Sequence, residues 1–488
     1  MAHWLSKSSY LRGWQCPKAL WMWKHRPDLR RPPSPQQLAI FEQGTQVGLL
    51  AQQLFPGGVD CSPRHHHAQE PALAATQEAV QRGVPAIYEA TFMHEGVLAA
   101  VDILARDGDG WTLVEVKSST SAKDQFLEDC ALQYHVVQGA GTNVTGVRLL
   151  LIDNHYVRQG ELEVDRLLTA LDVTDEVLAR QPAVRERIAS LKGTLNDAMP
   201  DVPIGPQCES PYPCEFKPTC WKEVPARSVF LLSHIGKKAF ELHHSGIREL
   251  KDVPEEAGLS PAQRLQVSVE RSGRPHVEAG PIRDFVAGLR YPLHHLDFET
   301  FALAVPPFDG VRPYQAIPFQ FSLHVEDGPG KPPGHLSFLA EAGGDPREEF
   351  SNTLLRSIRP EGDILVYNRS FEARIIKELA RDLPHHASAL RGLLPRLKDL
   401  ALPFARHWYL DPAMNGRHSI KSVLPVLVPE LRYTDLEIGS GDLASLSFAQ
   451  LMAGRYTGDI QQLRNALEAY CTLDTLAMVR VLRVLRDI

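Results

Sequence analysis

Acidic residues with a spacing suited to metal-dependent hydrolysis stand in Leu296-Asp297-Phe298-Glu299. This stretch is typical of a buried strand, in which residues i and i+2 point to the same face, so Asp297 and Glu299 share a face. Two carboxylates about 4 Å apart repel by about 4 kcal/mol at an effective dielectric of about 20. Such a pair persists only if a cation lies between them or one carboxylate is protonated. The spacing indicates a cation site or, taken alone, a solvated strand end.

Two later segments favour the cation site. Glu372 follows Tyr367-Asn368-Arg369-Ser370-Phe371 at the start of a helical pattern, and Tyr470 and Asp474 share one face of another helix. Over residues 290–488 these motifs resemble the DEDD exonucleases of the DnaQ-like, ribonuclease H-like class. The resemblance implies that Asp297, Glu299, Glu372 and Asp474 hold two divalent metals, that Tyr470 orients the attacking water, and that the chemistry is 3′→5′ exonucleolytic. One departure is Glu372, where that family usually has Asp.

A second set of chemical residues lies in the N-terminal half. The pattern predicts strands over 86–92, 96–104 and 111–117, then a helix through Phe126 and Val137. Asp102 and Glu115 suit a divalent metal that polarises a phosphate and activates water, and Lys117 suits the stabilisation of developing negative charge. A surface hairpin with a solvated Glu and Lys is the alternative.

The N-terminal half resembles the PD-(D/E)xK nucleases, specifically the RecB-like and CRISPR-associated RecB-like exonuclease group. That group pairs this core with cysteines at both ends of the domain, which here implies Cys16, Cys208, Cys214 and Cys220. Four thiolates suit a [4Fe-4S] cluster or zinc, and the lack of a C-x2-C pair favours iron–sulfur. The five-residue gaps in the trailing cluster depart from the family. Gly48 also stands where the family often has a metal-binding His, which implies either weaker metal binding or Glu89 as the substitute ligand.

These assignments predict an α/β protein with three segments. Residues 1–222 form a PD-(D/E)xK restriction-endonuclease-like domain with the four-Cys cluster, and residues 286–488 form a ribonuclease H-like exonuclease domain. Residues 223–285 form a helical linker, in which 232–253 indicates a helix-hairpin-helix-like element or a plain helical connector.

Composition limits the possible functions. The chain has 488 residues, too many for one typical core, and a net charge of −7, which excludes a generally basic nucleic-acid coat but not a local basic groove. No apolar run approaches the length of a membrane span, and the first residues lack a signal-peptide core, so we expect a cytoplasmic protein without a membrane partner. The three histidines His65, His66 and His67 indicate a solvated loop.

Together the patterns predict a metal-dependent nuclease with two active sites that use Mg²⁺ or Mn²⁺. We expect it to act on DNA rather than RNA, and its C-terminal site to degrade single-stranded DNA. One rival is a nucleic-acid-binding protein with a degenerate N-terminal nuclease fold, in which only the C-terminal exonuclease is active, with RNA as a possible substrate. Gly48 and Glu372 are the residues that favour this rival.

Overall fold

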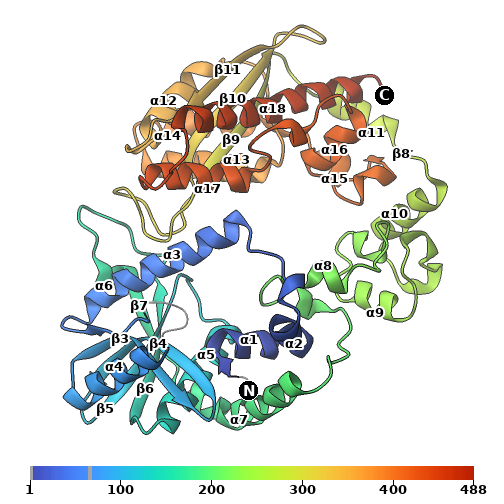
Figure 1. Ribbon diagram of the computed structural model, residues 1–488. Coiled ribbons are helices and arrows are strands. Elements are labelled where there is room, and N and C mark those ends of the chain that lie inside the picture. The colour runs from blue at the N-terminus through green and yellow to red at the C-terminus, as the bar shows by residue number, and fades with distance from the viewer. Residues whose placement is uncertain (1–3, 64–68) are drawn as a thin grey trace. The chain divides into compact units, whose positions relative to one another are not determined.

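The computed structural model describes residues 4–63 and 69–488, so the expectation for His65, His66 and His67 lies outside the described residues. The chain divides into two compact units. The first comprises Met1–Glu223 and Leu303–Tyr314, and the second comprises Val224–Ala302 and Gln315–Ile488. Each contains a β-sheet covered by helices, so the protein is of mixed α/β type (Figure 1). No helix in the described part of the chain combines the length and apolar character needed to cross a membrane.

This division differs from the predicted segments in two respects. Residues 224–285, expected to form a separate linker, are part of the second unit, and residues 303–314 are part of the first. The segment 232–253 contains one α-helix, α9 (Lys238–His244), and a 3-10 turn, η5 (Leu250–Asp252), instead of two helices joined by a hairpin. Val253, which follows this turn, has extended backbone and precedes Pro254, and a proline disfavours helical backbone in the residue before it.

The sheet of the first unit is mixed and seven-stranded in the described residues, with the order β2-β3-β4-β5-β6-β7 and with β1 beside β4. The β3–β4 and β4–β5 pairs are antiparallel, whereas β5 and β6 are parallel. The predicted strands are confirmed: β3 and β5 are slightly longer than predicted, and the strand predicted at 96–104 lies at 97–107. The strands are β1 (Leu5–Ser6), β2 (Val59–Asp60), β3 (Ala86–His94), β4 (Val97–Asp107), β5 (Gly110–Lys117), β6 (Val144–Ile152) and β7 (Leu168–Asp172).

Helices pack against both faces of this sheet because β5 is apolar on both sides. Leu113 belongs to the core cluster that includes Phe126 and Cys130 of α5, whereas Val114 belongs to the cluster that includes Val47 of α3. The period of two therefore directs Glu115 toward the α5 side. The helices of this unit are α1 (Lys7–Gln15), α2 (Pro17–His25), α3 (Pro35–Ala51), α4 (Gln69–Arg82), α5 (Asp124–Gly139), α6 (Val164–Leu167), α7 (Thr174–Asn196) and α8 (Lys217–Cys220).

The main sheet of the second unit has the order β11-β10-β9-β12-β13, with β9 at its centre. Strands β11, β10 and β9 are antiparallel neighbours, whereas β9, β12 and β13 run parallel. These strands are β9 (Leu293–Phe301), β10 (Ile317–Glu326), β11 (Gly334–Leu339), β12 (Ile364–Val366) and β13 (Leu397–Asp399), and a separate pair joins β8 (His276–Val277) to β14 (Tyr409–Leu410).

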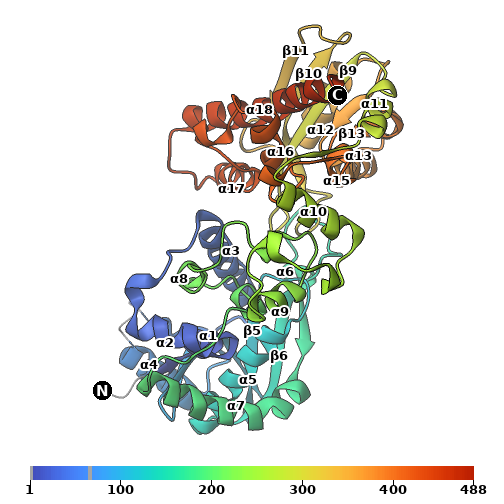
Figure 2. The same cartoon turned by 90° about the vertical axis from the view of Figure 1, so that its right-hand side faces the viewer.

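Alternation along β9 sends its residues to two helical layers. Phe298 packs edge-on against Phe350 of α12 (Arg347–Ser357), and Phe301 on the opposite face contacts Phe448 of α17 (Gly441–Met452). The long helix α18 (Ile460–Arg486) packs on β9 and β10, as Figure 2 shows. The other helices of this unit are α10 (Pro261–Ser272), α11 (Ala279–Ala287), α13 (Arg369–Asp382), α14 (Ala387–Leu393), α15 (Leu402–Ala405) and α16 (Ile420–Leu427).

Candidate functional site

Three of the predicted C-terminal carboxylates converge. Asp297 and Glu299 lie on the central strand β9, and Asp474 lies on α18, which packs over that strand. One oxygen from each of these three residues lies within 4.8 Å of the other two. Alternation along β9 places Asp297 and Glu299 on the face of the strand that α18 covers. The apolar face of α18 packs on that same face and brings Asp474 close to them.

Glu372 is the fourth predicted carboxylate and lies in the first turn of α13. It is 1% exposed, and its Oε2 atom is buried without a hydrogen-bond partner among the described residues. It is outside the 4.8 Å group, but its charge contributes to raising the pKa of Asp297. We call Asp297, Glu299, Glu372 and Asp474 the carboxylate site.

Burial and mutual repulsion disfavour the ionised state at the carboxylate site. Burial, followed by the charge of Asp474, raises the pKa of Glu299 to about 8. Burial raises the pKa of Glu372 to about 8 and that of Asp474 to about 6. The pKa of Asp297 is raised well above its usual range by burial and then by Asp474. Oxygen ligands held this close to one another are what Mg²⁺ and Mn²⁺ prefer, and a divalent cation would offset their repulsion.

Two tyrosines and one lysine surround Asp474. The Tyr433 hydroxyl donates to Asp474 Oδ1 at 2.5 Å, and burial, followed by Asp474, raises the pKa of Tyr470. Both phenols are therefore neutral near pH 7. The amino group of Lys421 lies 4.9 Å from the Tyr470 ring centroid, and its charge lowers the pKa of Glu299 and Asp474 against the effect of burial.

Asp399 at the end of β13 positions the helix that carries Glu372. Its two carboxylate oxygens accept hydrogen bonds from the backbone N–H groups of Asn368 and Arg369, each at 3.1 Å. Asn368 precedes α13 with φ of 77°, in the left-handed region that asparagine tolerates better than most residues. The neighbouring strand therefore supplies the cap that fixes the start of α13.

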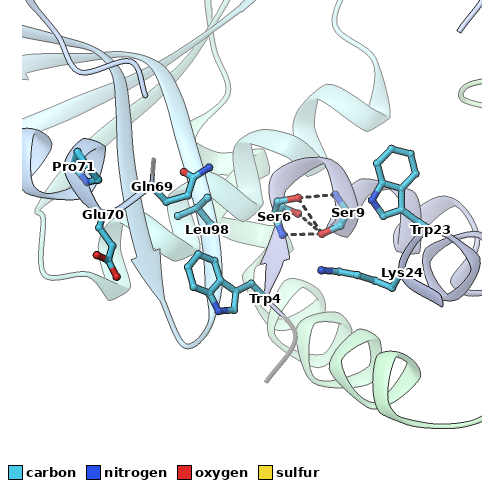
Figure 3. A pocket seen from close by; sticks show the side chains of 9 residues that line it. All are labelled: Trp4, Ser6, Ser9, Trp23, Lys24, Gln69, Glu70, Pro71 and Leu98. Atoms are coloured by element: carbon cyan, nitrogen blue, oxygen red, sulfur yellow. Dashed lines mark hydrogen bonds between the residues drawn. The ribbon is translucent and has the colours of Figure 1, made fainter. Parts of the chain in front are cut away.

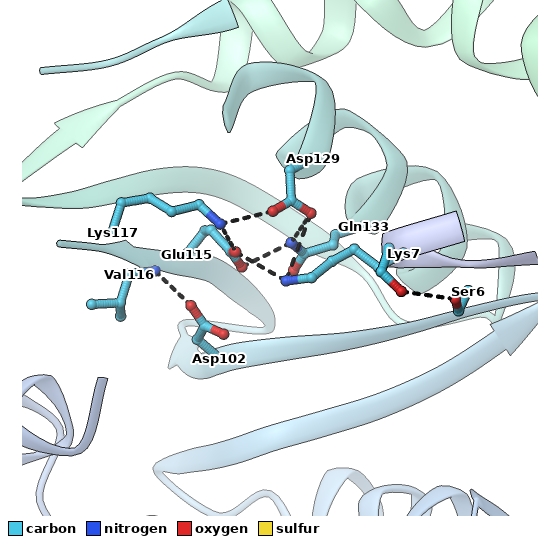
Figure 4. Close-up of polar contacts among 9 residues, drawn as sticks. Ser6, Lys7, Asp102, Glu115, Val116, Lys117, Asp129 and Gln133 are labelled. Carbon is cyan, nitrogen blue, oxygen red and sulfur yellow. Dashed lines mark hydrogen bonds and ion pairs between the residues drawn. The ribbon is translucent and has the colours of Figure 1, made fainter. Parts of the chain in front are cut away.

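The N-terminal candidates Glu115 and Lys117 also meet, together with three residues from other elements. Glu115 Oε1 accepts from Lys117 Nζ at 2.5 Å and from Lys7 Nζ at 2.9 Å, and Glu115 Oε2 accepts from Gln133 Nε2 at 2.8 Å. Asp129 on α5 accepts from Lys117 Nζ at 2.8 Å and from Gln133 Nε2 at 2.9 Å. Figure 4 shows this arrangement, which we call the lysine–carboxylate site.

The charges in the lysine–carboxylate site balance one another. Burial and Asp102 oppose ionisation of Glu115, but Lys117 and Lys7 outweigh them and lower its pKa. Burial likewise opposes the charge of Lys117, and Asp129 and Glu115 outweigh it and raise the pKa well above the usual value. Unlike the carboxylate site, this site contains its own cations.

Lys7 reaches the lysine–carboxylate site because the start of α1 is fixed. Ser6 caps this helix: the Ser9 N–H donates to Ser6 Oγ at 3.3 Å, and the Ser6 N–H donates to Ser9 Oγ at 2.7 Å, as Figure 3 shows. Lys7 is therefore the first residue of α1, and its amino group approaches Glu115 and Asp129.

Asp102 and Glu89 lie beside this site without joining Glu115 in a compact ligand group. Asp102 Oδ2 accepts from the backbone N–H of Val116 at 2.8 Å. Burial and then Asp102 raise the pKa of Glu89 to about 7, and Glu89 has a left-handed φ of 53°. Among the described residues, Glu89, Asp102 and Glu115 do not place three oxygens within 4.8 Å of one another. Gly48 lies on α3, and a Cβ built there meets nothing within 4 Å.

The four predicted cysteines Cys16, Cys208, Cys214 and Cys220 line one small pocket between α2 and the segment 202–220. Among the described residues, no three of their sulfurs lie within 4.8 Å of one another. A tetrahedral zinc with Zn–S bonds of about 2.3 Å would hold sulfurs about 3.8 Å apart. The thiols thus face a common space but are spread more widely than a single zinc ion requires.

Sequence reasoning identified the acidic motifs but missed several of their partners. Asp129 could have been found, because Asp129 and Gln133 are i and i+4 on one helix face. Lys7 and Tyr433 gave no local signal, since Lys7 lies 108 residues from Glu115 and Tyr433 lies 41 residues from Asp474.

The fold and both sites describe a mixed α/β protein in which acidic side chains from distant segments are buried together. Residues 294–419, which include β9 and the start of α13, match a family described as "Domain of unknown function (DUF2779)". The chain is 26% identical over 222 residues to the uncharacterized protein UU173 of Ureaplasma parvum, a match covering 41% of this chain and 32% of that protein. It is also 26% identical over 212 residues to an uncharacterized protein of Mycoplasma pneumoniae, the MG366 homolog, covering 40% and 32%. The matches thus span about a third of these relatives' length.

Proposed function

We propose that the protein is a metal-dependent nuclease whose principal active site is the carboxylate site. The observation that carries this proposal is the convergence of the buried Glu299 and Asp474 with the half-buried Asp297, one oxygen of each lying within 4.8 Å of the others, with Glu372 beside them. Divalent cations would offset the repulsion among these carboxylates, and Oε2 of Glu372 has no hydrogen-bond partner among the described residues, so it is available as a ligand atom. The DEDD exonuclease resemblance of the three motifs is consistent with this arrangement and makes 3′→5′ exonuclease chemistry in a ribonuclease H-like domain the proposed reaction.

The residues around the metals have separate proposed roles. Divalent ions held by Asp297, Glu299, Glu372 and Asp474 would polarise the phosphate and activate water. Tyr470 orients the attacking water, since a neutral phenol is a poor ligand for Mg²⁺. Tyr433 holds the Asp474 carboxylate through its hydrogen bond. Lys421 is the nearby cation that stabilises negative charge on the scissile phosphate.

The lysine–carboxylate site is the proposed second active site. Its Glu115 and Lys117 carry the PD-(D/E)xK resemblance, and Asp102 with Glu89 would complete the metal ligands there. The alternative is that the first unit only binds nucleic acid. The ion pairs of Glu115 with Lys7 and Lys117 favour this alternative, because both occupy Oε1 of Glu115, an oxygen atom that a metal would need.

A pocket beside Ser6 and Ser9 supports nucleic acid as the partner, with DNA as the proposed substrate. The pocket, of about 420 Å³, is lined by residues that include Trp4, Trp23 and Lys24 (Figure 3). Trp4 is 47% exposed and offers a surface on which a base can stack, whereas Arg12 and Arg30 both lie against the Trp23 ring.

For the four cysteines we propose a [4Fe-4S] cluster. The thiols line a common pocket at a spacing wider than a zinc tetrahedron, which suits a larger group. The cluster would tie the start of the first unit to the segment around Cys214, and this gives it a structural role.

The test is cleavage of end-labelled single- and double-stranded DNA and RNA with Mg²⁺ or Mn²⁺. We expect Asp297→Asn to abolish 3′→5′ degradation, whereas Asp284→Asn, a change at an exposed position in the same unit, leaves it intact. Lys117→Ala, with Lys222→Ala as its exposed control, separates the second site from the first. Metal-dependent degradation that survives in Asp297→Asn but is lost in Lys117→Ala would transfer the activity to the first unit. Absence of cleavage on every substrate would refute the proposal.

A further inference from the structure

The turn between β3 and β4 has an unusual residue at its tip. His94 pairs with Val97, so Glu95 and Gly96 form a two-residue hairpin turn, with φ of 46° and 67°. Such turns favour Asn, Asp or Gly, because both positions require the left-handed region. A glutamate held there has a strained backbone. The tip thus carries an acidic residue with a strained backbone and a side chain that is 64% exposed, directly after a histidine.

A second histidine meets this tip from α5. The rings of His94 and His135 have centroids 5.6 Å apart. Gly139, one helical turn after His135, makes room for this approach, because a Cβ at position 139 would lie 2.2 Å from Cδ2 of His94.

The three side chains present ligand atoms to a common point. One ligand atom each from His94, Glu95 and His135 lies within 4.8 Å of the other two. The Nε2 atom of His135 is buried and has no hydrogen-bond partner among the described residues. A buried polar atom left unpaired is destabilising, and coordination to a metal would remove that cost. Lys192 donates to the backbone carbonyl of Glu95, and Oε1 of Glu95 lies 3.8 Å from Nε2 of His94, so the carboxylate faces the imidazole.

We infer that His94, Glu95 and His135 form a binding site for a divalent transition-metal ion of the zinc class. Two imidazoles and one carboxylate are a donor set that zinc accepts, with water in the fourth position. Imidazole ligands disfavour Mg²⁺, so this site and the carboxylate site select different ions. The inference does not depend on nuclease activity.

Such an ion would join the β3–β4 hairpin to α5. That helix also carries Asp129 and Gln133, which contact Lys117 and Glu115 in the lysine–carboxylate site. Zinc is therefore expected to stabilise the first unit and to hold α5 against the sheet.

The test is zinc binding by the full chain in equilibrium dialysis with excess Mg²⁺, which occupies the carboxylate site. The unaltered chain is compared with His135→Ala and with Glu95→Gln, and His155→Ala provides an exposed histidine control in the same unit. The cysteines are the same in all four proteins, so differences report the proposed site. We expect the unaltered chain and His155→Ala to bind one more zinc per chain than His135→Ala and Glu95→Gln. Zinc should raise the melting temperature of the unaltered chain and of His155→Ala only.

Equal zinc content in all four proteins would overturn the inference. Circular dichroism without zinc establishes that each variant is folded. If His135→Ala fails to fold, Glu95→Gln decides the question alone, because it changes only a side chain at the surface of the hairpin. A Glu95→Gln protein with undiminished zinc binding would then refute the site.

Discussion

Neutralising one carboxylate of the carboxylate site should stabilise the protein when divalent metal is absent. The change is Glu299→Gln, which keeps the shape of the side chain and removes its charge. At the 4.8 Å limit of the group, two charges repel by about 3.5 kcal/mol at an effective dielectric of about 20. The rise in the pKa of Glu299 from 4.5 to about 8 corresponds to about 5 kcal/mol. Burial is the largest cause of this rise and the charge of Asp474 the second, so repulsion accounts for part of it.

The assay is thermal unfolding of the full chain near pH 8.5, in EDTA and in Mg²⁺. This pH is above the pKa of Glu299, so most of the unaltered chains carry a charged Glu299 in the buried site. For a unit of about 250 residues, the stabilisation corresponds to a rise on the order of 10 °C for Glu299→Gln in EDTA. Mg²⁺ at about 100 times its dissociation constant should stabilise the unaltered chain by about 2.7 kcal/mol and the variant by less.

Two results would refute this reasoning. The first is a Glu299→Gln protein that is less stable than the unaltered chain in EDTA, because burial and repulsion would then not disfavour the charge of Glu299. The second is an equal gain from Mg²⁺ in both proteins, because Glu299 would then not be a ligand. Asp284→Asn removes a carboxylate from the surface of the same unit and should change neither melting temperature.

Four other outcomes follow from the structure. Tyr470→Phe should keep metal binding, measured by calorimetry, and slow cleavage by on the order of 10²-fold. Anaerobically purified protein should contain about four irons per chain, and Cys214→Ser should lose them and lower the melting temperature; zinc without iron would contradict this. Lys117→Ala should abolish any cleavage that persists in Asp297→Asn. Burial lowers the pKa of His294 from 6.5 to about 4. Unfolded chains therefore bind an extra proton in that range, and stability should fall by about 3 kcal/mol as pH drops from about 6.5 to 4, but not in His294→Gln.

Local periodicity was enough to predict the strands that carry the acidic residues. The alternation of apolar and acidic residues around Asp297 and Glu299 defines β9, and the same argument places Glu115 and Lys117 on β5. The i and i+4 relation of Tyr470 and Asp474 on α18 is equally local. These patterns predict which residues share a face without requiring knowledge of the partner segments.

The partners could not be predicted because they depend on tertiary packing. Lys7 reaches Glu115 only when α1 lies against the sheet, and the capping serine beside it signals a helix start rather than a site. Tyr433 lies in a 3-10 turn with no periodic pattern, and its hydroxyl meets Asp474 through the fold alone. The prediction of a helix-hairpin-helix-like element over 232–253 was based on a short pattern. That pattern is equally compatible with the single helix and the 3-10 turn found there.

The segment Leu303–Tyr314 has a practical consequence for the design of truncated proteins. Ala304 belongs to the core cluster that contains Val47 and Val114, and the Tyr314 hydroxyl donates to the Ser118 carbonyl at 2.7 Å. A fragment that stops at residue 222 lacks these contacts and leaves part of that core open to water. A fragment that begins at residue 224 has these residues as a loop between β9 and β10. The two proposed activities are therefore best separated by point substitutions in the intact chain. A fragment could be inactive because it is misfolded, so its loss of activity would not show which site performs the reaction.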